Sequence, residues 1–157
     1  MVMESVMNLM IGKVAEIELV YKTKVKASER PAVQSSKDAF VILSGLWDEN
    51  KLELLEQFCV LFLDKSHKVL AFNNISSGGI DSTVVDIRLI FVSALKVGAS
   101  SIVAAHNHPS GNLKPSKQDV AMTNKIKAAG ELLDIKLLDH IILTQEAYCS
   151  FADEGLL

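Results

Sequence analysis

The sequence is poor in cysteine, in long apolar runs and in positive charge. Its two cysteines, Cys59 and Cys149, do not make a disulfide framework, and no Cys-x-x-Cys pair offers thiolates to a metal. No apolar run approaches the roughly 20 residues that span a bilayer. The net charge of −3 gives no overall attraction to phosphate backbones. These absences argue against a disulfide-rich secreted scaffold, a membrane protein and a basic nucleic-acid binder.

The first residues also lack the features of a signal peptide. Residues 1–12 carry no basic leading segment, and the charged residues Lys13 and Glu16 follow at once. We therefore expect a cytoplasmic protein without membrane contact.

Apolar residues, by contrast, are numerous enough for a single core. The chain has 157 residues, of which 49% are hydrophobic and 22% charged, as in globular proteins. We divide it into an N-terminal segment, 1–34, with a strand expected over 14–25, and one domain over 35–157. Strands and helices alternate along this domain. The pattern predicts an α/β fold, a single three-layer domain in which a mixed sheet is flanked by helices.

The expected elements follow from apolar periodicity and from turn and cap signals. The continuous apolar run over 56–63 is typical of a strand covered on both faces, and 48–51 is expected to be a solvated turn. Helices are expected over 35–48, from a cap at Asp81 or Ser82 to Gly98, and over 117–133; the other strands are expected over 69–75, 101–106, 136–143 and 148–152.

A group of metal-ligating residue types follows the strand expected over 101–106. His106 and His108 are two apart, so they point to the same side of an extended chain. After a loop rich in glycine and proline, Ser116-x-x-Asp119 opens a helix. Two imidazoles and one carboxylate without a thiolate leave a fourth zinc position for water, as in catalytic zinc sites. We predict one Zn²⁺ per chain, held by His106, His108 and Asp119.

Each of these residues also has an ordinary structural explanation. Ser116-x-x-Asp119 has the form of an N-terminal capping box, although a side chain that caps a helix can also face a metal. A lone histidine at a strand end is commonly a polar terminus. The specific signal is the whole spacing, His-x-His-x7-Ser-x2-Asp. The contiguous letters His-Asn-His are not the signature of HNH nucleases, which is spread over a hairpin and a helix.

With these residues the chain resembles the JAMM/MPN (JAB) metalloproteases and, within them, the RadC-like branch. The resemblance covers about residues 35–151. It is carried by His106-Asn107-His108-Pro109-Ser110-Gly111, Pro115-Ser116, Asp119 and Asp139-His140. It implies a JAB/MPN, cytidine-deaminase-like fold, and it implies His106, His108 and Asp119 as zinc ligands.

The resemblance further implies two catalytic side chains. An upstream glutamate on a strand, which looks like Glu56, would be the general base toward a zinc-bound water. Glu53, three residues earlier, is the alternative carboxylate. Ser116 would donate a hydrogen bond to the oxyanion that develops during hydrolysis.

Asp139 and His140 are candidates for supporting roles beside the metal. Asp139 could orient a metal-bound imidazole, because such ligands usually donate their second N–H to a carboxylate or carbonyl; the alternative is a local salt bridge. His140 lies among apolar residues, where a histidine is more often a hydrogen-bonded core or outer-shell residue than a direct ligand.

The expected function is that of a zinc-dependent metallohydrolase that cleaves a peptide or isopeptide bond in an unidentified peptide or protein substrate. The alternative is a RadC-like, metal-binding accessory protein in DNA repair, recombination or mobile-element function, without proteolysis. Longer RadC-like proteins carry an N-terminal helix-hairpin-helix region, whereas the residues before Glu56 are expected to form one strand and one helix. Net charge gives nucleic-acid binding no support. A zinc phosphodiesterase or deaminase is less favoured, because zinc deaminases use cysteine ligands. The oligomeric state is left open.

Overall fold

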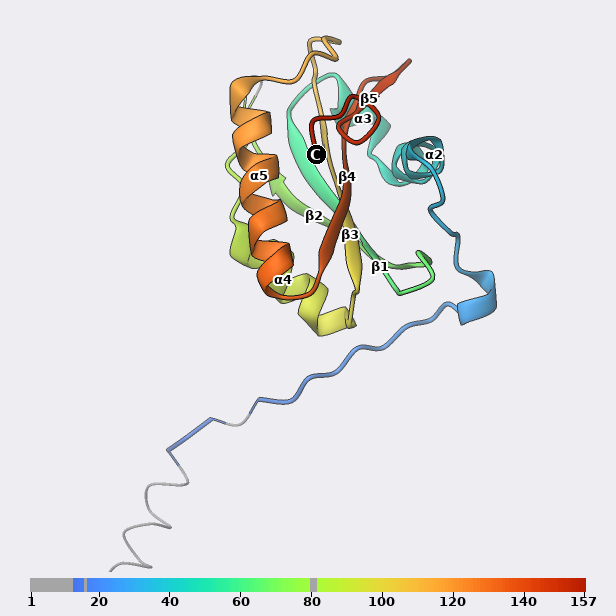
Figure 1. The fold of residues 1–157 in the computed structure, drawn as a ribbon, viewed down its shortest axis with the longest axis vertical. Coiled ribbons are helices and arrows are strands. Elements are labelled where there is room, and N and C mark those ends of the chain that lie inside the picture. Colours follow the sequence, from blue (N-terminus) through green and yellow to red (C-terminus); the bar gives the residue numbers. More distant parts are fainter. Residues whose placement is uncertain (1–12, 16, 80–81) are drawn as a thin grey trace, which may run out of the picture.

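The fold is a three-layer arrangement around one mixed sheet (Figure 1). A computed structural model describes residues 13–15, 17–79 and 82–157. Five strands lie in the order β2-β1-β3-β4-β5, and only β3 and β4 run parallel, as a mixed α/β sheet requires. Their bounds are β1 (Gln57–Leu63), β2 (Val69–Ser77), β3 (Ser101–Asn107), β4 (Lys136–Leu143) and β5 (Tyr148–Ser150).

Helices cover both faces of the sheet. The helices are α2 (Ser36–Leu46), α3 (Glu49–Leu52), α4 (Ile87–Val97) and α5 (Lys117–Leu132), with a 3₁₀ turn, η1, at Ala27–Glu29. In Figure 1, α4 and α5 lie on one side of the sheet and α2 lies on the other. The predicted three-layer α/β fold is therefore confirmed.

Strand β1 supplies apolar side chains to both layers. Successive side chains on a strand point to opposite faces. Phe58, Val60 and Phe62 accordingly pack with α4 and α5, whereas Cys59 and Leu61 pack with α2. All seven residues of β1 are buried. This burial explains why β1 is a continuous apolar run rather than an alternating one.

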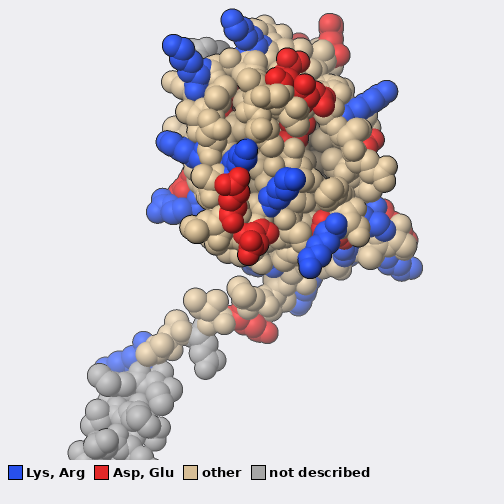
Figure 2. Space-filling model, in the orientation of Figure 1, with Lys and Arg blue, Asp and Glu red and all other residues tan. Residues whose placement is uncertain are grey.

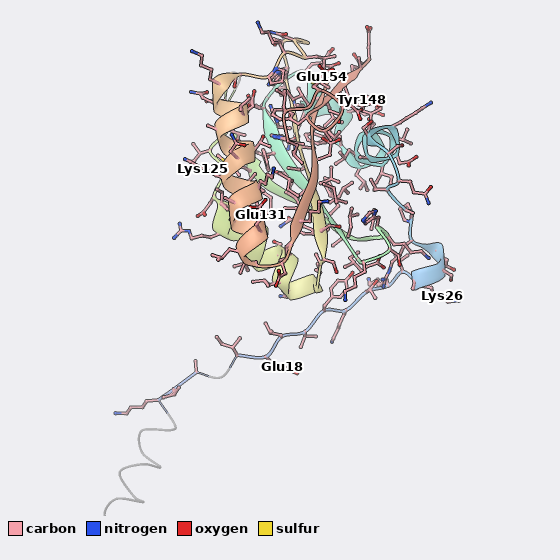
Figure 3. The ribbon with its side chains drawn as sticks, in the orientation of Figure 1. Glu18, Lys26, Lys125, Glu131, Tyr148 and Glu154 are labelled. Carbon is pink, nitrogen blue, oxygen red and sulfur yellow. The ribbon has the colours of Figure 1, made fainter. Side chains whose placement is uncertain are left out.

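The strand expected over 14–25 is wrong for the residues that the structure describes there. Residues 17–24 are irregular, and Ile17 and Leu19 are 89% and 80% exposed. Glu18 lies on this segment well away from the sheet (Figure 3). A strand gains stability from pairing and from burying one face. Between the described residues of 14–25 and the sheet there is one hydrogen bond, from the Tyr21 hydroxyl to the Leu70 carbonyl, 2.5 Å long.

The start of the second long helix and the turn at 48–51 also differ from expectation. Helix α4 begins at Ile87, after Asp86, whose side chain accepts a hydrogen bond from the Arg88 backbone. Ser82 is not its cap, and Asp81 lies outside the described residues. The reason is that the segment after Ser82 is held against β2: the Ser76 hydroxyl donates to the Val84 carbonyl at 2.7 Å. The expected turn at 48–51 is the short helix α3, capped by Asp48.

Within the described residues, no helix is long and apolar enough to cross a bilayer. Figure 2 shows lysine and arginine side chains intermixed with aspartate and glutamate over the face in view.

Candidate metal centre

The centre lies where strand β3 passes into helix α5. Because β3 and β4 are parallel, the chain must cross over between them, and α5 makes this crossover. The helix therefore begins beside the carboxyl end of β3, where sites in such sheets gather. Gly111, with φ +77°, takes the left-handed backbone conformation in the intervening loop. His108 is fixed to the next strand by a hydrogen bond from its backbone N–H to the Leu143 carbonyl, 3.1 Å long.

The three predicted ligand residues converge. The Nε2 atoms of His106 and His108 are 2.9 Å apart. Asp119 places Oδ1 at 3.3 Å from His106 Nε2 and Oδ2 at 3.7 Å from His108 Nε2. One ligand atom from each residue lies within 4.8 Å of the other two. His106 is 2% exposed. The triad is thus compact enough to hold a metal ion.

The hydrogen bonding of His108 shows that this donor set fits a cation. Its Nδ1 lies 2.5 Å from the Asn112 carbonyl oxygen, which can only accept, so Nδ1 carries the proton. In the neutral imidazole, Nε2 then presents a lone pair to the Asp119 carboxylate and to His106. Acceptors that face one another in this way need a positive charge between them.

Without an ion, burial and the contacts in the cluster shift the pKa values of three of its groups. Burial disfavours the charged form of Asp119, but the contacts with His106 and His108 hold the pKa of its carboxyl well below the ordinary value. The side-chain contact with Asp119 raises the pKa of His108, against the opposing effect of burial. Burial lowers the pKa of His140 well below its ordinary value, so this ring is neutral.

The triad lines a cavity of about 330 Å³ that also contains the predicted catalytic residues. Glu56 and Ser116 line it, and so do His140, Phe58 and Met122. Glu53 instead lines a separate cavity with Trp47 and Leu143. Of the two glutamates, only Glu56 therefore faces the triad.

Comparison with known proteins identifies the domain. The family model described as RadC-like JAB domain matches residues 33–156. The chain belongs to the RadC-like JAB domain family. It is 49% identical over 124 residues to the UPF0758 protein of Flavobacterium johnsoniae, which covers 79% of this chain and 53% of the relative. The UPF0758 protein of Methanosarcina mazei is 35% identical over 147 residues, 94% of this chain and 62% of the relative.

A third relative, the UPF0758 protein of Porphyromonas gingivalis, is 47% identical over 103 residues, which are 65% of this chain and 45% of the relative. The chain spans about half the length of these curated relatives. The names of these relatives state no activity. The comparisons thus establish the RadC-like JAB family but no reaction or substrate.

In this RadC-like JAB domain, Glu56 is fixed through its backbone. It comes directly before β1, its N–H donates to the Gly79 carbonyl at 2.9 Å, and its carbonyl accepts from the Gly78 N–H at 2.8 Å. Burial raises the pKa of the Glu56 carboxyl, while the charges of His106 and His108 oppose this rise. A carboxylate with a raised pKa is suited to accept a proton near neutral pH.

Ser116 caps helix α5 and also lines the cavity. Its Oγ accepts from the Asp119 N–H at 3.1 Å, and its own N–H donates to the Asp119 carboxylate at 2.6 Å, which completes a capping box. The capping box and the triad thus share the Asp119 side chain. Within the described residues, the Ser116 hydroxyl proton has no acceptor, so it is available to a ligand in the cavity.

The side chains of Asp139 and His140 point in different directions, and of the two only His140 contacts a residue of the triad. His140 Nε2 lies 2.8 Å from Nδ1 of His106. Asp139 does not orient an imidazole, and the prediction that it could do so is wrong. Its carboxylate accepts from the Ser150 hydroxyl at 2.6 Å and from the Ala152 N–H at 3.0 Å. Consecutive residues on a strand point to opposite faces, so one of this pair had to face away.

Two buried polar residues of the site were missed by sequence reasoning. The Asn107 side chain accepts from the Gln57 N–H at 2.7 Å and donates to the carbonyls of Leu52 and Leu55 at 2.6 and 2.9 Å. It thereby fixes the backbone on both sides of Glu56. Thr123, the other one, contacts His140. The position of Thr123, one helical turn after Asp119 and on the same face of α5, is the sequence signal that could have identified it.

Proposed function

We propose that this chain is a zinc-dependent hydrolase of the JAMM type that cleaves a peptide or isopeptide bond. The observation that carries the proposal is the convergence of the His106, His108 and Asp119 ligand atoms in one cavity with a separate carboxylate, Glu56. A structural metal site needs no such additional acid–base group.

His106, His108 and Asp119 would hold the ion. A zinc ion bound there would supply the Lewis acidity that makes water a nucleophile near neutral pH. Glu56 is the proton carrier in this proposal. Its carboxylate takes a proton from the attacking water and returns it to the amide nitrogen as the carbon–nitrogen bond breaks. The products are a carboxylic acid and an amine.

Ser116 contributes a hydrogen bond to the carbonyl oxygen of the scissile bond. Its oxygen is engaged by the Asp119 N–H, which fixes the side chain while the hydroxyl proton stays free. A donor held in place before the reaction stabilises the negative charge that develops on this oxygen. Loss of one such donor typically costs about 10²–10³ in rate.

The second candidate function is a metal-binding accessory role without turnover, which the same triad would serve. Membership of the RadC-like JAB family is compatible with both functions. The two are distinguished by what Glu56 does: hydrolysis requires its carboxylate, whereas metal binding alone does not.

Metal content and turnover test the proposal in two steps. We expect elemental analysis of protein purified without chelator to find one zinc per wild-type chain, and much less in His106→Ala and Asp119→Ala. Zinc-loaded wild type is then screened against a library of peptide and isopeptide substrates, with Glu56→Gln as the control. Wild type that neither contains nor takes up zinc contradicts the metal site; zinc-loaded wild type that cleaves no library member favours the accessory role.

A further inference from the structure

A chain of three hydrogen bonds (the circuit) joins two of the three ligand residues behind the metal centre. His106 Nδ1 lies 2.8 Å from His140 Nε2, and His140 Nδ1 lies 2.6 Å from the Thr123 hydroxyl. Thr123 Oγ1 in turn lies 2.7 Å from the backbone carbonyl of Asp119. The circuit runs from β3 through β4 to α5. Its members are buried apart from Asp119, with Thr123 and His140 each 1% exposed.

The Thr123 hydroxyl sets the direction of these hydrogen bonds. A hydroxyl has one proton, and the Asp119 carbonyl can only accept, so the proton of Thr123 points to that carbonyl. Back-bonding of this kind to the carbonyl four residues earlier is common for threonine in helices. The Thr123 oxygen therefore accepts from His140, and His140 carries its proton on Nδ1.

The protonation of His140 in turn determines which nitrogen of His106 carries a proton. His140 is 1% exposed and its ring nitrogens contact His106 and Thr123 rather than a carboxylate, so the ring carries a single proton. A proton on Nδ1 then leaves Nε2 as an acceptor. His106 must donate to it from Nδ1, which leaves a lone pair on His106 Nε2. That atom is the one that lies 2.9 Å from His108 Nε2 and 3.3 Å from Asp119 Oδ1. Both imidazoles thus present lone pairs to the position of the ion.

We propose that Thr123 is a positioning residue whose hydroxyl, acting through His140, keeps the Nε2 lone pair of His106 directed at the metal position. The role assigned to Thr123, to support metal binding, rests on the proposed metal-dependent function. The protonation of His106 and His140 at Nδ1 does not depend on that function.

Removal of the hydroxyl releases the whole circuit. Without an acceptor at position 123, His140 is free to move its proton to Nε2 and donate to His106. His106 then carries its proton on Nε2, which points an N–H at the place where a cation should bind. Loss of a partner that orients a metal ligand typically costs about 10–100-fold in metal affinity.

Thr123→Val and Thr123→Ser form the test pair. Valine keeps the shape and removes the hydroxyl, whereas serine keeps the hydroxyl. Thr144→Val is the matched control, because the Thr144 hydroxyl bonds to the Ala147 carbonyl outside the centre. Nitrogen-15 NMR of the imidazole rings in metal-free protein gives the protonation sites, and zinc affinity is measured by competition with a chelator.

We expect His106 and His140 to be protonated at Nδ1 in wild type, in Thr123→Ser and in Thr144→Val. Thr123→Val should show protonated Nε2 at His140 and bind zinc about 10–100-fold more weakly. Wild type with His140 protonated at Nε2 overturns the inference without any variant, as does Thr123→Val with unchanged rings and affinity. If wild type binds no zinc, the proposed function fails, and the ring protonation alone decides the inference.

Discussion

Phe58 and His106 lie directly opposite each other on β1 and β3, with their rings stacked 9° from parallel and their centroids 6.3 Å apart. Continued by two residues beyond the observed pairs, the same register would place Glu56 opposite His108. Because side chains two apart on a strand share a face, the pair explains why Glu56 lies on the side of the metal centre. Glu53, in the C-cap of α3, is not part of this strand.

The two glutamates should therefore respond differently to loss of charge. Glu56→Gln is expected to retain zinc and lose turnover by at least the roughly 10²-fold typical of an absent acid–base group. Glu53→Gln should keep both properties, because its side chain lines a different cavity. Zinc content and rates on a substrate found by library screening check both variants; the reverse pattern would show that Glu53 is the base.

Asn107 should control both the stability of the domain and the position of Glu56. Asn107→Leu leaves the Gln57 N–H and the carbonyls of Leu52 and Leu55 without their partner. An unsatisfied buried polar group costs roughly 1–3 kcal/mol, and we expect a loss of at least that size in the free energy of unfolding. Urea unfolding measures it. Asn50→Leu, an exposed asparagine in α3, is the control and should change stability by less than about 0.5 kcal/mol.

The buried Asp139 carboxylate should make stability depend on pH in one direction. Burial raises its pKa above the ordinary value of 3.8, although hydrogen bonds from Ser150, Ala152 and His140 oppose the rise. The folded protein then holds this proton more tightly than the unfolded chain. The contribution of Asp139 is full below about pH 3.8 and is lost as the pH rises through the folded pKa.

The variant Asp139→Asn has no carboxyl group to titrate at this position, so comparing it with wild type isolates the contribution of Asp139. Unfolding free energies of wild type and variant are compared by urea titration between pH 4 and 7. Wild type should gain stability relative to the variant toward the acidic end. A difference that is constant with pH, or that grows toward pH 7, contradicts the assignment.

Two helical glycines should respond oppositely to alanine. A Cβ on Gly130 in α5 would collide with the backbone carbonyl of Ile135, whereas a Cβ on Gly45 in α2 meets nothing within 4 Å. Gly130→Ala is expected to destabilise by about 1–3 kcal/mol, as overpacking does. Gly45→Ala should stabilise by roughly 0.5–1 kcal/mol through helix propensity. Thermal unfolding of the two variants checks the pair, and equal effects would contradict it.

The convergence of the three candidate metal ligands could be predicted from the sequence because they are local. His106, His108 and Asp119 lie within one strand, one loop and the first turn of one helix, so spacing alone places them together. Glu56 required more, namely a register between β1 and β3, and resemblance to the JAMM/MPN family supplied the candidate. The apolar runs of β1, β3 and β4 likewise predicted the three-layer fold, because buried strands between helices have that pattern.

Other features depend on contacts that no local pattern records. Asn107 bonds to residues about 50 positions earlier, and Thr123 finds His140 only after α5 has packed on the sheet. The sequence over 14–25 alternates like a strand, but its described residues pair with no strand. The N-cap of α4 is Asp86 rather than the expected Ser82, because hydrogen bonds to the end of β2 hold the residues after Ser82 outside the helix.

The parallel pairing of β3 with β4 determines when the centre can come into existence during folding. One set of groups comes from β3 and α5, and their partner His140 comes from β4, so no two consecutive elements contain the whole arrangement. The centre is complete only when the β3-α5-β4 crossover has closed. A metal ion that binds more tightly when His140 is in place stabilises the closed crossover by mass action. We therefore expect zinc affinity to rise during refolding when this unit closes.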